Sequence, residues 1–281
     1  MNSGVRLCAA ALMSLSLAAA YAHDDATARY LANAGVLVAH GDAKIVFDPL
    51  YRSSYDRYEL VPDAIERALF AGASPYDDID AVFISHYHGD HFTADVMLEF
   101  LDAQDTVHLY APAQAVAALE AAGAGEELLS RVTAVDLRYG DAPVVHADGE
   151  LVVEAVGIPH SGWPTRMTDV QNIAWRVTLD GAATVVHLGD ADTKPEHYDL
   201  HPTYWSSAKT DLALPPYWYF LSPNGRLVLE SRIRARHAIG VHVPGDMPDD
   251  RAARPAEIRE FDLFTIPGEE RVFSHGEEDA R

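Results

Sequence analysis

Four side chains that commonly bind metal ions lie within six residues of this sequence: His86, His88, Asp90 and His91. Catalytic metal chemistry requires neutral imidazoles and carboxylates on a stiff support, with one coordination position left open. His86 and His88 are two residues apart, so an extended backbone directs both rings to the same side. Gly89 then lets the chain turn before Asp90 and His91. This spacing predicts a catalytic metal site, whereas an isolated histidine is more often a surface or core residue.

The elements that would position this cluster alternate between short apolar runs and helical patterns. Residues 81–85 predict a buried strand that leads directly into the histidines. Residues 35–40 and 44–48 flank Gly41-Asp42, which predicts a β-hairpin. Further strands are expected at 107–110, 151–158, 172–179, 184–188 and 238–243, and helices at 62–70, at 93–101 with Thr93 as N-cap, from about 112, and at 226–236. The charged, Pro- and Gly-rich segment after Pro244 is expected to wrap around the surface or be partly mobile. This mixture suggests two sheets with helices outside and leaves the strand order open.

The first twenty-two residues are set apart from the predicted core. Arg6 precedes an almost wholly apolar run at 7–20, and Ala20 and Ala22 occupy the two positions that a signal peptidase recognises. The run is too short to span a bilayer. We therefore expect a secretory signal at residues 1–22, cleavage near Ala22, and a periplasmic or secreted protein. Cys8 is the only cysteine, so the expected mature chain, residues 23–281, has neither disulfides nor thiolate ligands.

A formal net charge of −22 narrows the range of partners. A protein this acidic repels phosphate backbones, which argues against nucleic acid as the main partner. No stretch after the N-terminal run is long and apolar enough for a membrane span, so no stable membrane insertion is expected. A small-molecule substrate is the expected partner, and the oligomeric state is left open.

The histidine cluster and three later segments together resemble the metallo-β-lactamase superfamily. The resemblance runs from about Tyr30 to Pro244. It comprises a hairpin ending in Phe47-Asp48-Pro49, the His-x-His-x-Asp-His motif, Pro159-His160-Ser161-Gly162, Leu188-Gly189-Asp190 and Val241-His242-Val243-Pro244. It implies an α/β fold, the four-layer αββα sandwich of the metallo-β-lactamase type, with a hydrolase domain at 23–281 and a core at about 28–244.

The resemblance also implies two adjacent metal sites built from seven ligands. These are His86, His88 and His160 for the first ion, Asp90, His91 and His242 for the second, and Asp190 bridging both. Because all of them offer nitrogen or oxygen, zinc is the default for both divalent ions, with iron or manganese as alternatives. Water shared by two such ions becomes a hydroxide near neutral pH, and Asp90 would be the catalytic residue that orients it. His187 and His201 are the nearest rivals to the later ligands.

A bridging Asp190 narrows the expected chemistry. The penicillin-destroying enzymes of the superfamily commonly carry cysteine or another arrangement in the second site. This sequence is closer to branches that hydrolyse lactones, thioesters and phosphodiesters, and its residues 33–38 resemble the branch of ascorbate-phosphate lactonase and the N-acyl-phosphatidylethanolamine phospholipases. We expect an exported binuclear hydrolase of an ester, lactone, amide or phosphodiester, although fold and metal centre do not determine the substrate.

Several side chains near the predicted ligands are candidates for substrate contacts. They are Tyr87, Trp163, Arg166 and Lys194. The two cations among them could bind an anionic group or be ordinary surface charges. Asp192 is a candidate partner for a ligand histidine. The aromatic run from Leu214 to Phe220 fits core packing or, alternatively, an apolar pocket wall or partner surface.

Two alternatives come from other functional classes. One is a mononuclear non-heme iron oxidoreductase, such as the persulfide-dioxygenase branch of the same superfamily. The other is a non-catalytic metal-binding protein, which the complete ligand set disfavours. Metal analysis combined with a hydrolase screen separates all three.

Overall fold

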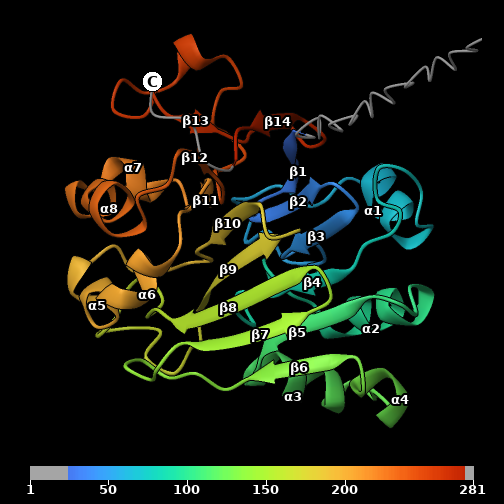
Figure 1. The fold of residues 1–281 in the computed structure, drawn as a ribbon. Coiled ribbons are helices and arrows are strands. Elements are labelled where there is room, and N and C mark those ends of the chain that lie inside the picture. Colours follow the sequence, from blue (N-terminus) through green and yellow to red (C-terminus); the bar gives the residue numbers. More distant parts are fainter. Residues whose placement is uncertain (1–24, 276–281) are drawn as a thin grey trace, which may run out of the picture.

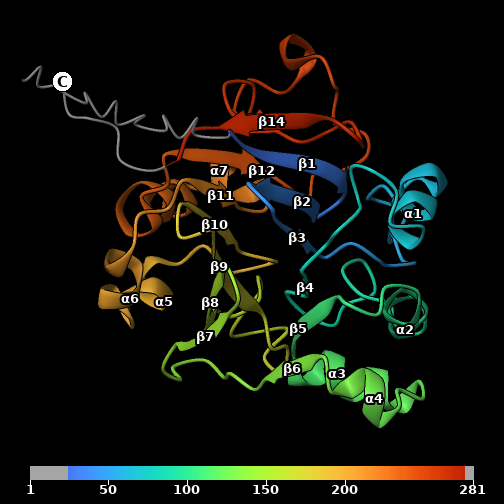
Figure 2. The same cartoon turned by 45° about the vertical axis from the view of Figure 1, so that its right-hand side comes forward.

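The computed structural model describes residues 25–275. Two seven-stranded mixed sheets pack face to face, and helices cover both outer faces (Figure 1; Figure 2). The expected signal sequence at residues 1–22 lies outside the described residues. Within the described range, no helix is long and apolar enough to cross a membrane.

The first sheet has the order β14-β1-β2-β3-β4-β5-β6 and is antiparallel from β14 to β3 and parallel from β3 to β6. Its strands are β1 (Ala26–Ala32), β2 (Gly35–His40), β3 (Ala43–Phe47), β4 (Ala81–Phe83), β5 (His108–Pro112), β6 (Val132–Val135) and β14 (Glu270–Phe273). The predicted hairpin is confirmed, because β2 pairs with β3 around Gly41-Asp42. The parallel crossovers contain α1 (Asp63–Phe70), α2 (Ala94–Ala103), α3 (Ala113–Ala121) and α4 (Glu126–Leu129), which lie together on the outer face.

The second sheet repeats this pattern in the order β13-β12-β11-β10-β9-β8-β7, parallel from β13 to β10 and antiparallel from β10 to β7. Its strands are β7 (Val144–Asp148), β8 (Leu151–Gly157), β9 (Ile173–Leu179), β10 (Ala183–His187), β11 (Leu212–Leu214), β12 (His237–Gly240) and β13 (Asp262–Leu263). The helices of this half are α5 (Pro195–Asp199), α6 (Pro202–Ser207), α7 (Trp218–Leu221), α8 (Pro223–Val228), a π-helical turn (Leu229–Ile233) and a 3-10 turn (Arg251–Ala253). The helix expected at 226–236 therefore starts earlier and changes pitch at Leu229.

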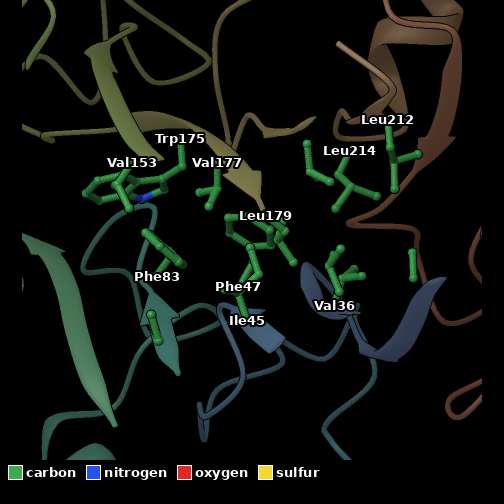
Figure 3. Close-up of a cluster of buried hydrophobic side chains, with 14 of the residues drawn as sticks. Val36, Ile45, Phe47, Phe83, Val153, Trp175, Val177, Leu179, Leu212 and Leu214 are labelled. Atoms are coloured by element: carbon green, nitrogen blue, oxygen red, sulfur yellow. The ribbon is translucent and has the colours of Figure 1, made fainter. Parts of the chain in front are cut away.

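Alternation of side chains along the strands builds three apolar layers. In β3, Ile45 and Phe47 face the other sheet, whereas Val46 faces the helices. Figure 3 shows the layer between the sheets, with Val36, Ile45, Phe47 and Phe83 opposite Val153, Trp175, Val177, Leu179, Leu212 and Leu214. One outer layer joins the first sheet to α1–α4, and the other joins the second sheet to α5–α8. Three apolar layers between four layers of helices and sheets make the αββα sandwich that the resemblance implied, and they confirm the two sheets with helices outside that the sequence pattern suggested.

Several local expectations differ from the structure. The segment after Pro244 does more than wrap around the surface, because β13 pairs with β12 and β14 pairs with β1, adding an edge strand to each sheet. The strand expected at 238–243 ends at Gly240, because the backbone of His242 has φ 56° and cannot continue it. Thr93 does precede α2, but its hydroxyl accepts from the Arg52 amide at 3.0 Å instead of capping the helix.

Candidate functional site

The predicted ligands gather where strands of both sheets end. His86 to His91 follow β4, His160 follows β8, Asp190 follows β10 and His242 follows β12. Hydrogen bonds join the sheets at this edge. The Ser85 carbonyl accepts from the Ile173 amide at 2.9 Å. The Ile84 carbonyl accepts from the Trp175 indole, also at 2.9 Å. The ends of the strands are thus held together by groups other than the ligands.

The first group consists of His86, His88 and His160, which each offer a nitrogen within 4.8 Å of the others. His86 Nε2 lies 3.1 Å from His88 Nδ1. His160 Nδ1 donates to the Ser161 carbonyl at 2.8 Å, which leaves its Nε2 with a free lone pair. His86 is fully buried and His88 is only partly buried, so this group faces the open side of the site.

The second group consists of Asp90, His91 and His242. His242 Nε2 lies 3.2 Å and His91 Nε2 3.8 Å from Asp90 Oδ2. Asp190 lies beside both histidines, with Oδ1 3.3 Å from His91 Nε2 and 3.2 Å from His242 Nε2. Its other oxygen, Oδ2, lies 3.4 Å from His160 Nε2 of the first group. One carboxylate therefore faces both groups, with one oxygen toward each.

The donor atoms of this cluster fit divalent metal ions. Within residues 25–275, the buried atoms His91 Nε2, His160 Nε2, His242 Nε2 and Asp190 Oδ1 make no hydrogen bond. A buried polar atom without a partner is costly. Cations shared among these atoms would satisfy all of them at once. The donors are imidazole nitrogens and carboxylate oxygens, which suit zinc and also iron or manganese.

Asp48 orients His91, a member of the second group, through a buried hydrogen bond. It is fully buried, and its Oδ1 accepts from the Ser85 amide at 2.7 Å. Its Oδ2 accepts from the Ser85 hydroxyl at 2.6 Å and from His91 Nδ1 at 2.8 Å. Donation from Nδ1 fixes the tautomer of His91 and leaves Nε2 free to bind a metal. Sequence reasoning gave Asp48 no role, although Phe47-Asp48-Pro49 belonged to the resemblance.

Two buried asparagines, also missed from the sequence, hold the ligand-bearing segments together. The side-chain amide of Asn33 donates to the Asp90 carbonyl at 2.8 Å, and the backbone carbonyl of Asn33 accepts from the His242 amide at 2.7 Å. Asn172 Oδ1 accepts from the Asp190 amide at 2.9 Å. Asn33 opened the segment 33–38 of the resemblance without being given a role, and Asn172 was in no motif. Each acts between segments that are distant in the chain, which sequence pattern does not show.

Burial and neighbouring charges set the protonation of the cluster. Burial lowers the pKa of His86 well below its usual value, and nearby His91 adds to this effect. Burial would also lower the pKa of His91, but the Asp190 and Asp48 carboxylates outweigh it and raise that pKa well above the usual value. Burial would raise the pKa of Asp190, but His242 and His91 outweigh it and hold that pKa well below its usual range. Metal binding requires ionised carboxylates and neutral imidazoles, so an ion bound at His91 would displace the proton that the raised pKa favours there.

The candidate substrate contacts occupy different positions around the cluster. Tyr87 is 37% exposed, and its ring centroid lies 5.3 Å from that of His88. Arg166 is exposed and lies against Gly162. The Trp163 ring packs against two other rings, Tyr139 at 5.1 Å and His197 at 5.2 Å. Lys194 Nζ donates to the Trp163 carbonyl at 3.0 Å. Trp163 and Lys194 therefore hold one wall of the site together.

Three other sequence candidates lie outside the cluster. His187 Nε2 donates to the Ala34 carbonyl at 3.0 Å, and its ring stacks on Phe47. His201 precedes α6 and belongs to neither metal group. Asp192, expected to support a ligand histidine, contacts His197 at 3.5 Å. The carboxylate that supports a ligand histidine is Asp48 instead.

The aromatic run after β11 is divided between core and site. Tyr219 and Phe220 are buried in the helix-side apolar layer. Trp218 instead lies against the His242 ring, with centroids 5.3 Å apart. Tyr58, from the segment between β3 and α1, approaches the same ring more closely, at 4.1 Å. Core packing and an aromatic wall beside the site are therefore both present.

Two hollows lie beside segments that carry predicted ligands. One, of about 660 Å³, lies on the His160 side, with Pro159, Trp163 and residues 167–172 among its lining. The other, of about 540 Å³, lies on the His242 side and is lined by residues 56–58 and 244–246.

Comparison with known proteins agrees with this geometry. The chain is similar to the metallo hydrolase Igni18 from Ignicoccus hospitalis, with 16% identity and a TM-score of 0.58 over 89% of this chain and 98% of that one. It is similar to the metallo-beta-lactamase fold protein YhfI from Bacillus subtilis, with 17% identity and a TM-score of 0.57 over 89% and 99% of the two chains. An isothiocyanate hydrolase from Delia radicum gut bacteria matches with 15% identity and a TM-score of 0.56, over 87% and 98%. At these identities the structures show a shared fold.

Sequence comparison identifies the family. No curated protein matches this chain. The family described as the Beta-lactamase superfamily domain matches residues 44–243, a range that includes every predicted ligand from His86 to His242. The chain therefore belongs to the β-lactamase superfamily.

Proposed function

We propose that this chain, a metal-dependent hydrolase of the metallo-β-lactamase fold, binds two divalent ions, with zinc as the expected metal. The observation that carries the proposal is the position of Asp190, whose two oxygens face His160 on one side and His91 with His242 on the other. His86, His88 and His160 would hold the first ion. Asp90, His91 and His242 would hold the second, since Asp90 Oδ2 lies 3.8 Å and 3.2 Å from the Nε2 atoms of the two histidines. Asp190 would serve both.

The side chains around the ions determine how a substrate would react there. Two bound divalent ions would supply a hydroxide near neutral pH and polarise the bond that is attacked. Asp90 lies at the second group, where its carboxylate can orient the nucleophile and move a proton toward the leaving group. Asp48 keeps His91 in the tautomer that offers Nε2. The partly buried His88 and exposed Tyr87 leave the approach to the cluster open.

The substrate class we propose is a small molecule with an ester, lactone, amide or phosphodiester bond. The charge of −22 supports a small molecule over nucleic acid. A panel of such compounds, extended to thioesters, isothiocyanates and diphosphates, is assayed with protein purified from its host. We expect turnover of at least one compound that a chelator abolishes and added metal restores. Absence of any chelator-sensitive turnover contradicts the proposal.

Metal analysis of the same preparation tests the number and identity of the ions. We expect two ions per chain, with zinc as the main metal. A single iron ion per chain without hydrolysis would instead support the mononuclear iron oxidoreductase. A full metal load with no turnover of any kind would support a non-catalytic metal-binding protein.

We also propose export from the cytoplasm. The support is the N-terminal sequence, in which Arg6 precedes an apolar run and Ala20 and Ala22 precede the expected cleavage point. Mass spectrometry of the protein from a periplasmic or culture-supernatant fraction should give a chain that begins at His23. A cytoplasmic protein that retains residues 1–22 contradicts export.

A further inference from the structure

We propose that Tyr58 is a further catalytic residue, whose hydroxyl donates a hydrogen bond to the oxyanion that develops on the substrate beside the second metal group. This inference rests on the hydrolase function proposed above. It assigns a role to a residue outside the metal ligands and outside the candidate substrate contacts found from the sequence.

The ring of Tyr58 lies directly against a predicted ligand. It meets the His242 ring edge-on, with centroids 4.1 Å apart and an interplanar angle of 78°. Tyr58 is only partly buried, and it also lines the hollow of about 540 Å³ together with Arg57 and Pro244. Tyr58 therefore stands between this hollow and the metal cluster. A substrate that extends from the metals into the hollow passes the phenol.

The segment that carries Tyr58 is fixed to the site on both sides. The Ser53 amide donates to the carbonyl of Gly89, within the histidine motif, at 2.9 Å. The Gly245 amide, just after the last ligand, donates to the Arg57 carbonyl at 2.8 Å. A donor held this way needs little reorganisation when charge develops on the substrate, which is the property of an effective oxyanion donor.

The Tyr58 hydroxyl is also available for a substrate. Other tyrosines near the site use their hydroxyls within the fold: Tyr51 donates to the Glu59 carbonyl at 2.8 Å, and Tyr219 donates to the Asp192 carbonyl at 3.0 Å. Among residues 25–275, the Tyr58 hydroxyl makes no such bond. A phenol carries its proton at neutral pH and is therefore a donor.

Tyr58→Phe tests the proposal, because it removes the hydroxyl and keeps the ring against His242. With a compound that the wild type hydrolyses, we expect kcat to fall about 100-fold, as for loss of one oxyanion donor, with KM nearly unchanged. Metal content should equal that of the wild type. Inorganic phosphate provides a readout without turnover: its affinity for the metal-loaded protein, measured by calorimetry, should fall about 10-fold.

Tyr51→Phe is the matched control. Tyr51 is 1% exposed and cannot touch a substrate, and its hydroxyl donates to the Glu59 carbonyl instead of facing the site. We expect this variant to keep kcat and phosphate affinity within a few-fold of the wild type.

The outcomes separate the two proposals. Unchanged kcat or unchanged phosphate affinity in Tyr58→Phe overturns the role of Tyr58, and so does an equal loss in Tyr51→Phe. A wild type without chelator-sensitive turnover overturns the hydrolase function instead. Phosphate binding then still decides whether the Tyr58 hydroxyl contacts an oxyanion.

Discussion

The first group of the metal cluster (His86, His88 and His160) and the second group (Asp90, His91 and His242) form its two halves, which are supported in different ways. In the second half, His91 donates to Asp48, and Asp48 is held by both the amide and the hydroxyl of Ser85. All three residues are fully buried. In the first half, His160 donates only to the carbonyl of its own neighbour, Ser161. Buried bonds to a carboxylate orient the second half, whereas local geometry orients His160.

In the first half, the Ser85 hydroxyl also lies 3.0 Å from His86 Nδ1, whereas the segment of His160 depends on packing of aromatic rings. The Trp163 ring packs against Tyr139 and His197, and the Lys194 ammonium binds the Trp163 carbonyl. Hydrogen bonds to a charged, buried group are stronger than contacts at a partly exposed surface. We therefore expect substitutions in residues 160–172 to weaken metal binding more in the first half than in the second. Four substitutions test this difference, from the largest expected effect to the smallest.

Asp190→Ala removes the one group shared by the halves. We expect both ions to bind far more weakly and hydrolysis to fall by about 1000-fold or more, because each ion loses a ligand and the spacing between the ions is lost. Metal content and turnover are measured together. Asp192→Ala is the matched control, since its carboxylate contacts His197 and Lys194 instead of a ligand. Retention of both ions in Asp190→Ala would show that the halves are independent.

Gly189→Ala tests whether the halves share one scaffold. Gly189 has φ +54°, and an added Cβ would lie 2.6 Å from Ser85 Cβ and from Asn172 Oδ1. We expect unfolding free energy to fall by about 2–4 kcal/mol, with weaker metal binding in both halves. Gly181→Ala has a similar φ of +63° and no atom within 4 Å, so it should cost only about 1 kcal/mol. Equal losses, measured by denaturant unfolding, would argue against a steric effect.

Asp48→Asn should affect the second half more than the first. The asparagine keeps the size of the side chain but weakens acceptance from His91 Nδ1. We expect affinity for the second ion to fall about 10–100-fold, the usual effect of losing a group that orients a ligand histidine. Affinity for the first ion should fall less, because Asp48 reaches His86 only through the Ser85 hydroxyl, which lies 3.0 Å from His86 Nδ1. Stepwise metal titration by calorimetry measures both, and a loss confined to the first ion would reverse the comparison.

Trp163→Ala should affect the first half alone, and least. Loss of the ring frees the His160 segment from Tyr139 and His197. We expect only a few-fold loss of affinity for the first ion, because the His160–Ser161 bond survives. The exposed Thr168, changed to alanine, serves as the control in the same segment. Weaker binding of the second ion in Trp163→Ala would mean that Trp163 also supports the second half.

The residues that sequence reasoning placed best are those whose partners are close in the chain. The Gly41-Asp42 hairpin and the strand before the histidine motif depend on turn chemistry and short-range apolar pattern, and both are present. His160, Asp190 and His242 came from a family resemblance instead of spacing. The structure brings them together with the motif, and their roles as ligands stay a prediction that metal analysis decides.

Other parts of the fold and of the site could not be predicted from sequence pattern, for physical reasons. The charged segment after Pro244 gave no strand signal, and its strands form only because β1 and β12 offer unpaired edges. Asp48 and Asn33 act on groups more than forty residues away, such as His91 and Asp90. Their functions depend on which distant segments of the chain the fold brings next to them.

The sequence by itself determined the chemistry that this protein carries: a dense set of nitrogen and oxygen donors following a buried strand, in a fold of two sheets with helices outside. Only the tertiary structure decided how those donors are held. It placed Asp190 between the groups, Asp48 beneath His91, and Tyr58 against His242. The physical reason is that local pattern follows backbone periodicity, whereas ligand orientation depends on buried hydrogen bonds between segments that meet only in the folded protein.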